Sequence, residues 1–196
     1  MSAKPIPEPI RTAARTASAQ GPQLLNSERI RDRFGSYGIE ILADRNGLRR
    51  ANLYSHADGG KTCRTFALVH TLNAPRDIAA EHAAISSGRS IGATFRDSGW
   101  TVAKKTLLTG SAALAEIDPD VSRLMRLAGT ECIAVHAYHL IIEQHGQAIT
   151  YATILELHHP DYLGEAELAT LFSSSSDATA SPATVTELLR RFELYL

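Results

Sequence analysis

The chain has 196 residues, a formal net charge of −1 and 44% hydrophobic residues. This length and composition fit one folded domain with a sizeable core plus tails. The near-zero charge gives no sign of a nucleic-acid-binding surface. No apolar run approaches the roughly 20 residues of a membrane span, and the N-terminus lacks an apolar signal core. We therefore expect a protein that binds no nucleic acid and has no membrane span.

Composition divides the chain into four parts. Residues 1–23 are rich in Ala, Pro, Ser and Thr and predict a disordered tail. Residues 24–172 predict the folded domain. Residues 173–181 predict a Ser-rich linker, and residues 182–196 a C-terminal helix that either docks on the domain or meets a partner.

Turn signals and alternation predict six strands within the folded domain. Asn46-Gly47 is a strong hairpin signal, and a Gly-containing break at residues 144–147 predicts a second tight hairpin. The predicted strands are residues 38–44, 48–56, 62–72 and 100–108, and the two arms of a long hairpin between residues 132 and 160. Helices are predicted from about residue 26 to Gly35 and over residues 75–86, 90–98, 120–127 and 162–172. The expected fold class is α+β, a single antiparallel sheet of about six strands flanked by helices.

The two cysteines, Cys63 and Cys132, both fall in predicted strands. We expect them to be small buried residues in a reducing, cytoplasmic compartment, with no disulfide framework.

Glu156 is the one acid in the second arm of the long hairpin. Alternation places it on the same face as Ala152, Ile154 and His158, with Tyr151 on the other face. A carboxylate on an apolar face needs a cation or hydrogen bonds. It is therefore either a structural ion-pair partner or an acid that meets a ligand in a cavity.

Two arginines are candidate cations for this acid. Arg49 alternates with Ala51 and Leu53, and Arg64 alternates with Phe66 and Leu68, so both are predicted on apolar strand faces. One interpretation is an Arg–Glu pair in the core. The other is a planar guanidinium that binds a substrate carboxylate through two parallel hydrogen bonds.

Other chemistry has weaker signals. Residues 88–92 precede a predicted helix, whose start is either an ordinary helix start or an anion site. No HExxH or CxxC pattern occurs, so a metal site would need convergence of distant residues, and none is predicted. No GxSxG nucleophile or GxGxxG loop is present.

Several separated segments together resemble the chorismate lyase family, also called chorismate pyruvate-lyases, between about Leu24 and Leu163. They are NSERIRDRF before Gly38, LRR at residues 48–50 with Arg64-Thr65 beyond, SIGATF at residues 90–95 and ELHHP at residues 156–160. The resemblance implies a compact α+β fold with an antiparallel sheet. It also implies a carbon–oxygen lyase that converts chorismate to 4-hydroxybenzoate and pyruvate, as in ubiquinone biosynthesis, with no metal or organic cofactor.

The resemblance also assigns roles to residues. It implies that Ile30, Arg49, Arg64, Ile91 and Glu156 bind the substrate, and that Arg49 and Glu156 are the catalytic pair. Arg49 would hold the ring carboxylate, the backbone N–H of Ile91 would assist, and Glu156 would orient the ring hydroxyl.

The chain departs from the family pattern in several places. Arg50 replaces a Glu, Ser90 a Pro, and His158 and His159 apolar residues; the spacing from Gly146 to Glu156 is long, which suggests a bulge or a longer strand. These departures leave open a non-catalytic module that binds a small aromatic acid on the same fold. A third interpretation is an interaction protein whose cavity is filled by its own side chains.

Overall fold

The computed structural model describes residues 24–57, 59–128 and 131–172, and the single positions 184, 187, 188, 190 and 192. Within them lies one six-stranded antiparallel sheet in the order β1-β2-β3-β6-β5-β4, which confirms the predicted α+β class. The strands are β1 (Gly38–Arg45), β2 (Leu48–Ala57), β3 (Gly60–Thr71), β4 (Thr101–Ala113), β5 (Cys132–Gln144) and β6 (Gln147–His158). The predicted tail and Ser-rich linker lie outside the described residues.

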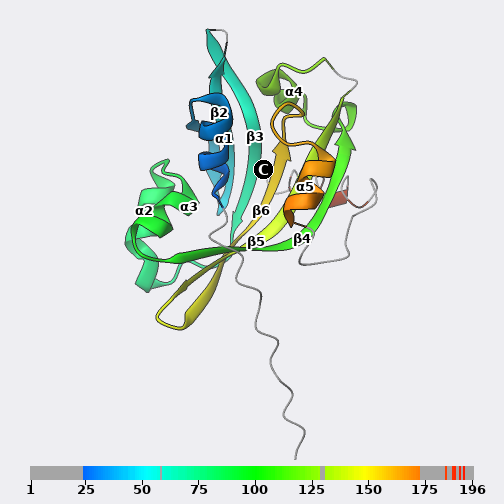
Figure 1. Ribbon diagram of the computed structural model, residues 1–196. Coiled ribbons are helices and arrows are strands. Elements are labelled where there is room, and N and C mark those ends of the chain that lie inside the picture. Colours follow the sequence, from blue (N-terminus) through cyan, green and yellow to red (C-terminus); the bar gives the residue numbers. More distant parts are fainter. Residues whose placement is uncertain are drawn as a thin grey trace, which may run out of the picture.

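In the described part of residues 24–172, short helical segments lie against the sheet or connect its strands (Figure 1). They are α1 (Asn26–Phe34), η1 (Arg76–Ile78), α2 (Ala79–Ser86), α3 (Ile91–Asp97), η2 (Leu114–Glu116), α4 (Pro119–Met125) and α5 (Glu165–Phe172), where η marks a 3-10 helix. In Figure 1, α1 lies over the half of the sheet that holds β2 and β3, and α5 lies over β5 and β4. None of the helices in this described part is long and apolar enough to cross a membrane.

Two tight turns set the register of the paired strands. Asn46 and Gly47 have φ of 53° and 76°, and His145 and Gly146 have φ of 52° and 78°. Positive φ at both central residues is the mark of a type I′ hairpin turn, whose twist matches that of the strands. Both predicted hairpins are therefore confirmed, and the second places His136 opposite Glu156 across β5 and β6.

The two faces of the sheet carry different cores. We call the face that carries Arg49, Ala67, Ile154 and Glu156 the front face, and it is covered by α1, α2, α3 and α5. The opposite face carries Leu68, Leu155 and Leu157 and packs against α4. The last helix also belongs there, since Phe192 is buried in this second core and Leu188 packs against it. Both faces are thus covered by helices.

A bulge in β6 corrects one expectation. Alternation predicts Tyr151 on the face opposite Ala152 and Ile154, but Tyr151 packs in the same cluster as these two residues. The register shifts between Leu140 and Ile141, so that Ala152 and Thr150 pair with neighbouring residues of β5 and Tyr151 is the extra residue. A bulge of this kind turns the extra side chain out of the alternation.

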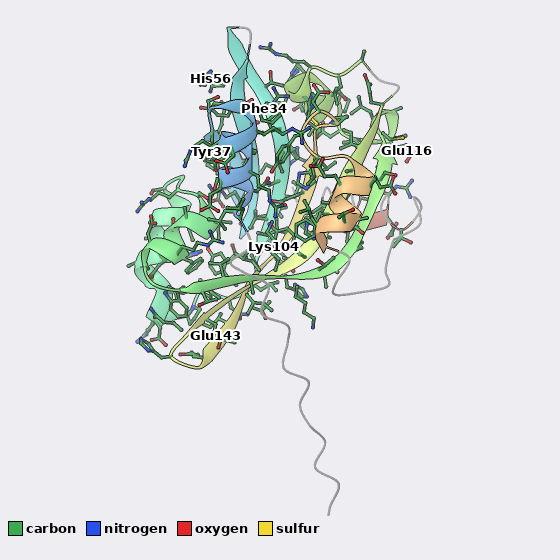
Figure 2. All side chains as sticks on the ribbon, in the orientation of Figure 1. Phe34, Tyr37, His56, Lys104, Glu116 and Glu143 are labelled. Atoms are coloured by element: carbon green, nitrogen blue, oxygen red, sulfur yellow. The ribbon has the colours of Figure 1, made fainter. Side chains whose placement is uncertain are left out.

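Cys132 corrects another expectation. Cys63 is buried, as predicted, but Cys132 is exposed, and both are free thiols. Cys132 is the first residue of β5, at the end of the strand. Figure 2 shows how side chains are distributed along the sheet, from His56 at one end to Glu143 near the β5–β6 hairpin, with Lys104 between them.

Candidate functional site

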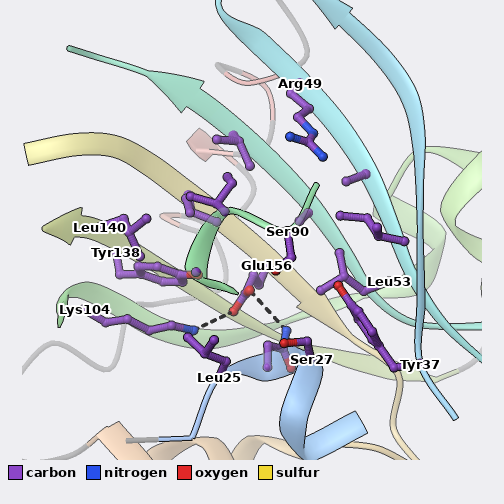
Figure 3. Close-up of a pocket in the computed structure, with 18 residues that line it drawn as sticks. Leu25, Ser27, Tyr37, Arg49, Leu53, Ser90, Lys104, Tyr138, Leu140 and Glu156 are labelled. Atoms are coloured by element: carbon purple, nitrogen blue, oxygen red, sulfur yellow. Dashed lines mark hydrogen bonds and ion pairs between the residues drawn. The ribbon is translucent and has the colours of Figure 1, made fainter. Parts of the chain in front are cut away.

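A cavity, which we call the central cavity, lies between the front face of the sheet and the starts of α1 and α3 (Figure 3). The centre of a water-sized sphere can occupy about 80 Å³ of it. One water needs about 10–15 Å³ by the same measure, so the cavity is open and not filled by its own side chains. Apolar residues from β1, β2, β3, β5 and β6 form most of its wall. The polar side chains that reach it are Asn26, Ser27, Tyr37, Arg49, Ser90, Lys104, Tyr138 and Glu156.

Three of the five predicted site residues line this cavity. Arg49, Ile91 and Glu156 reach it from β2, α3 and β6. Ile30 is fully buried in the core between α1 and the sheet, outside the cavity wall. Arg64 also lies outside the wall.

A second bulge moves Arg64 off the face of the sheet that carries Phe66 and Leu68. The register of β2 and β3 shifts so that Thr65 and Cys63 pair with consecutive residues of β2, and Arg64 between them has no partner in the ladder. Its guanidinium lies 3.8 Å from the centroid of the Phe34 ring, and its Nε donates a hydrogen bond to Ser55 at 2.8 Å. The predicted alternation of Arg64 with Phe66 is therefore wrong at this residue, and Arg64 packs against α1.

Arg49 is a buried cation, 4% exposed, at the cavity wall. Its Nη1 donates to the carbonyl of Ile85 at 2.8 Å and its Nη2 to that of Arg89 at 3.3 Å, while its buried Nε has no hydrogen-bond partner. No carboxylate of a described residue lies within ion-pair distance of it. Burial accordingly lowers the pKa of Arg49. A buried cation without a counter-ion is costly, and it favours an anionic ligand.

Glu156 is paired with Lys104 and not with an arginine. The Nζ of Lys104 lies 3.4 Å from Oε2 of Glu156, and Nδ2 of Asn26 donates to Oε1 at 3.1 Å, as Figure 3 shows. The proposed Arg–Glu core pair is therefore absent from the described residues. Burial opposes the charge on Glu156, but Lys104 outweighs it, with the neighbouring histidines and Asn26, and holds the pKa of this carboxyl at about 2. Glu156 is thus ionised at neutral pH.

Lys104 also lies over an aromatic ring. Its Nζ is 4.2 Å from the centroid of the Tyr138 ring, within the range of a cation–π contact. Burial and then the Glu156 carboxylate raise the pKa of Tyr138 well above its ordinary value, so its hydroxyl stays protonated. Lys104 was not identified from the sequence, because lysines are rarely buried and two adjacent lysines in a strand give no sign of a buried charge. Only the register of β4 against β5 brings it inward.

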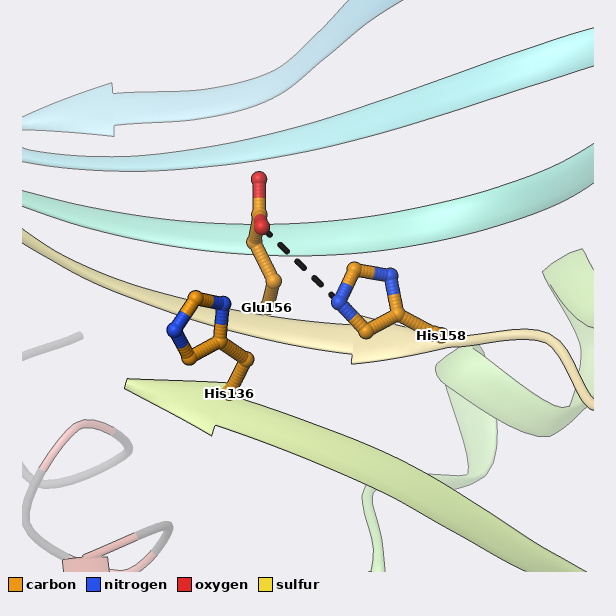
Figure 4. A group of neighbouring side chains, drawn as sticks. All are labelled: His136, Glu156 and His158. Atoms are coloured by element: carbon orange, nitrogen blue, oxygen red, sulfur yellow. Dashed lines mark ion pairs between the residues drawn. The ribbon is translucent and has the colours of Figure 1, made fainter. Parts of the chain in front are cut away.

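Two buried histidines lie beside Glu156 (Figure 4). His136 faces it across β5 and β6, and His158 follows it two residues along β6, with Nε2 of His158 3.8 Å from Oε2 of Glu156. Burial lowers the pKa of His136 to about 2 and that of His158 to about 4, so both imidazoles are neutral at pH 7. Within the described part of the chain, these three residues are the group that could hold a metal ion.

Comparison with known proteins adds little to this picture. No family model matches the chain, and no curated protein matches it significantly. Among solved structures, the C-terminal domain of YurK from Bacillus subtilis matches at 12% identity and a TM-score of 0.37, over 65% of this chain and 89% of that one. A TM-score this low carries no conclusion about fold or function.

Proposed function

We propose that the protein is a chorismate-lyase-like enzyme that eliminates pyruvate from chorismate and leaves 4-hydroxybenzoate or a related hydroxybenzoate. One observation carries the proposal: buried Arg49, which has no carboxylate partner among the described residues, shares a single cavity with ionised Glu156. A planar acid with a hydroxyl at its far end would meet both groups. The resemblance of the chain to chorismate lyases supports the same reaction.

Arg49 would bind the ring carboxylate. Its Nη1 and Nη2 each hold a backbone carbonyl, which fixes the guanidinium plane, and its Nε is left without a partner. A guanidinium binds a carboxylate with charge-assisted hydrogen bonds in a defined plane. Ile91 is the first residue of α3 and lines the cavity, and the N–H of a first helical residue has no partner within the helix, so this N–H would assist.

Glu156 would orient the ring hydroxyl. Because its pKa is held at about 2, it is a strong hydrogen-bond acceptor at neutral pH but a weak base. In the reaction the bond from the ring to the enolpyruvyl oxygen breaks, a ring hydrogen leaves as a proton, and the enolpyruvate becomes pyruvate. Formation of an aromatic ring drives this step, so the cavity needs mainly to align the substrate and exclude water. The proton acceptor would be either a bound water or, despite its low basicity, Glu156.

A second candidate is a non-catalytic module that binds a small aromatic acid. The charged groups in the cavity wall are Arg49, Lys104 and Glu156, which together carry one net positive charge. That charge matches a monocarboxylate such as 4-hydroxybenzoate, whereas chorismate carries two negative charges. The observation favours binding of the product-like acid and leaves turnover to experiment.

The test is release of pyruvate from chorismate by the purified full chain, followed by a coupled dehydrogenase and by the absorbance of the aromatic product. Glu156→Gln should lose turnover. Arg50→Gln is the control and should keep turnover, because the Arg50 side chain pairs with Asp118 on the opposite face of the sheet. Absence of pyruvate from folded wild-type protein would overturn the enzyme proposal. Binding of 4-hydroxybenzoate by that same protein, measured by calorimetry, would then support the second candidate.

A further inference from the structure

The cluster of His136, Glu156 and His158 has a feature that the proposed function does not use. These three side chains are 0%, 5% and 1% exposed. One ring nitrogen from each histidine and one oxygen of Glu156 all lie within 4.8 Å of one another. Figure 4 shows the two rings on either side of the Glu156 stem, on two neighbouring strands.

One ring nitrogen of each histidine is buried without a hydrogen-bond partner. Nδ1 of His136 and Nε2 of His158 have no hydrogen bond, although most buried polar atoms in proteins have one. The other nitrogen of each ring is held by a threonine: Nε2 of His136 lies 3.2 Å from Oγ1 of Thr106, and Nδ1 of His158 lies 3.0 Å from Oγ1 of Thr65. When each ring donates its N–H to its threonine, the two bare nitrogens carry lone pairs beside a carboxylate.

We propose that His136, Glu156 and His158 form a binding site for a divalent first-row transition-metal ion, with Zn²⁺ as the ion to test. Two imidazole nitrogens and one carboxylate oxygen are ligands that Zn²⁺ takes in proteins, whereas Mg²⁺ and Ca²⁺ prefer oxygen alone. Ligand atoms at about 2.0–2.2 Å from a tetrahedral ion lie roughly 3.4 Å apart, so they need to draw together by no more than about 1.5 Å. Thr65 and Thr106 hold the rings in the orientation that binding requires.

Lys104 opposes the ion. Its ammonium lies 3.4 Å from the Glu156 oxygen and already supplies a positive charge to the cluster. A metal ion there repels it, so binding requires the lysine side chain to swing away or to lose its proton. Removal of Lys104 therefore strengthens metal binding, whereas removal of either histidine weakens it. An adventitious surface site would show neither response.

The experiment is calorimetric titration of the chelator-treated full chain with Zn²⁺. We expect one ion per chain, affinity reduced at least about tenfold in His136→Gln and in His158→Gln, and affinity increased in Lys104→Met. His139→Gln is the matched control, since His139 lies on β5 but outside the cluster and bonds Thr153, and its affinity should be unchanged. Failure of folded wild-type protein to bind Zn²⁺, or equal affinity in the wild type and both cluster variants, would overturn the site.

A second readout uses only the wild-type chain, so it tests the site even if the variants fail to fold. Co²⁺ added to the wild-type chain should give the strong visible absorption of a tetrahedral site, and Zn²⁺ should displace it. Absence of that band at saturating Co²⁺ would count against the site. The inference does not depend on the proposed reaction, which needs no metal. Zn²⁺ binding without pyruvate release would support the site alone, and pyruvate release with a chelator present but without Zn²⁺ binding would support the enzyme alone.

Discussion

The ammonium nitrogen of Lys104 lies 3.4 Å from Oε2 of Glu156, although β4 and β6 are not neighbours in the sheet. Lys104 pairs with Leu140 of the intervening strand β5, and its side chain crosses above the Tyr138 ring to reach the acid. The lysine side chain is 12% exposed and the glutamate side chain 6%. Lys104 thus keeps the Glu156 carboxylate ionised in the wall of the mostly apolar central cavity. The proposed site needs this charge to accept a hydrogen bond from the ligand hydroxyl.

Lys104→Met should destabilise the protein by about 3 kcal/mol, because it leaves Glu156 buried without its main counter-charge. Urea unfolding at pH 7 measures this loss. The double variant Lys104→Met with Glu156→Gln should recover part of it, with a coupling of about 1 kcal/mol or more. Additive losses in the double variant would show that the two groups do not stabilise each other.

Arg49→Ala should weaken binding of 4-hydroxybenzoate by about tenfold to a hundredfold, since a hydrogen bond to a charged group contributes about 1.5–3 kcal/mol. The affinity of Arg49→Lys for 4-hydroxybenzoate should lie between those of wild type and Arg49→Ala, because lysine keeps the positive charge but lacks the planar guanidinium. Calorimetry measures affinity and thermal unfolding measures the fold, with Arg50→Gln as the control. If Arg49→Ala unfolds the domain, then its bonds to the carbonyls of Ile85 and Arg89 are its main role.

Ala67→Leu should abolish ligand binding and leave the fold intact. Ala67 is 4% exposed and lines the central cavity, so the added carbons enter open space. Ala137→Leu is the matched control, because Ala137 is equally buried but lies in the packed core on the opposite face. There the same change should cost about 1–3 kcal/mol and leave the affinity of the folded protein unchanged. Equal ligand affinity in Ala67→Leu and wild type would place the ligand elsewhere.

Alternation and turn residues predict the strands and place Arg49 and Glu156 each on an apolar face of its own strand, because the side-chain period of a strand is two and tight turns fix the register. That the two residues meet in one cavity was implied only by the family resemblance. Each error has a local cause. The bulges at Arg64 and Tyr151 insert one residue into a strand, and every inference from alternation changes face there. Lys104 was missed because its nearness to Glu156 depends on the order of β4, β5 and β6, which no local pattern carries. His136 was missed because the bulge at Tyr151 shifts the register of the β5–β6 hairpin by one residue and so brings His136 opposite Glu156.

Phe192→Ala should destabilise the domain by about 3 kcal/mol, which is the usual cost of truncating a buried Phe. The described residues of the last helix place Phe192, 9% exposed, in the core that also contains residues of α4. Leu171→Ala is the control, since Leu171 is 37% exposed and its truncation should cost less than about 0.5 kcal/mol. Urea unfolding compares the two. An unchanged stability in Phe192→Ala would favour a helix that docks on a partner.

The two thiols should differ sharply in reactivity. Burial raises the pKa of Cys63 to about 12, so at pH 8 only about one molecule in 10⁴ carries the reactive thiolate, whereas Cys132 is exposed. A disulfide reagent at pH 8 should therefore titrate one thiol per native chain and two per unfolded chain. Cys132→Ser should reduce the native count to zero, and rapid labelling of that variant would show that Cys63 is accessible.

The raised pKa of the Cys63 thiol also predicts a loss of stability at alkaline pH. The Cys63 thiol has its ordinary pKa, about 8.5, in the unfolded chain and a raised pKa in the folded one. Between these values the unfolded state binds fewer protons, so the contribution is complete below about pH 8.5 and is lost as pH rises towards 12. Cys63→Ala removes this titration and should flatten the fall in unfolding free energy between pH 8.5 and 10 relative to wild type. Equal slopes in the two proteins would mean that the Cys63 thiol ionises as readily in the folded core as in the unfolded chain.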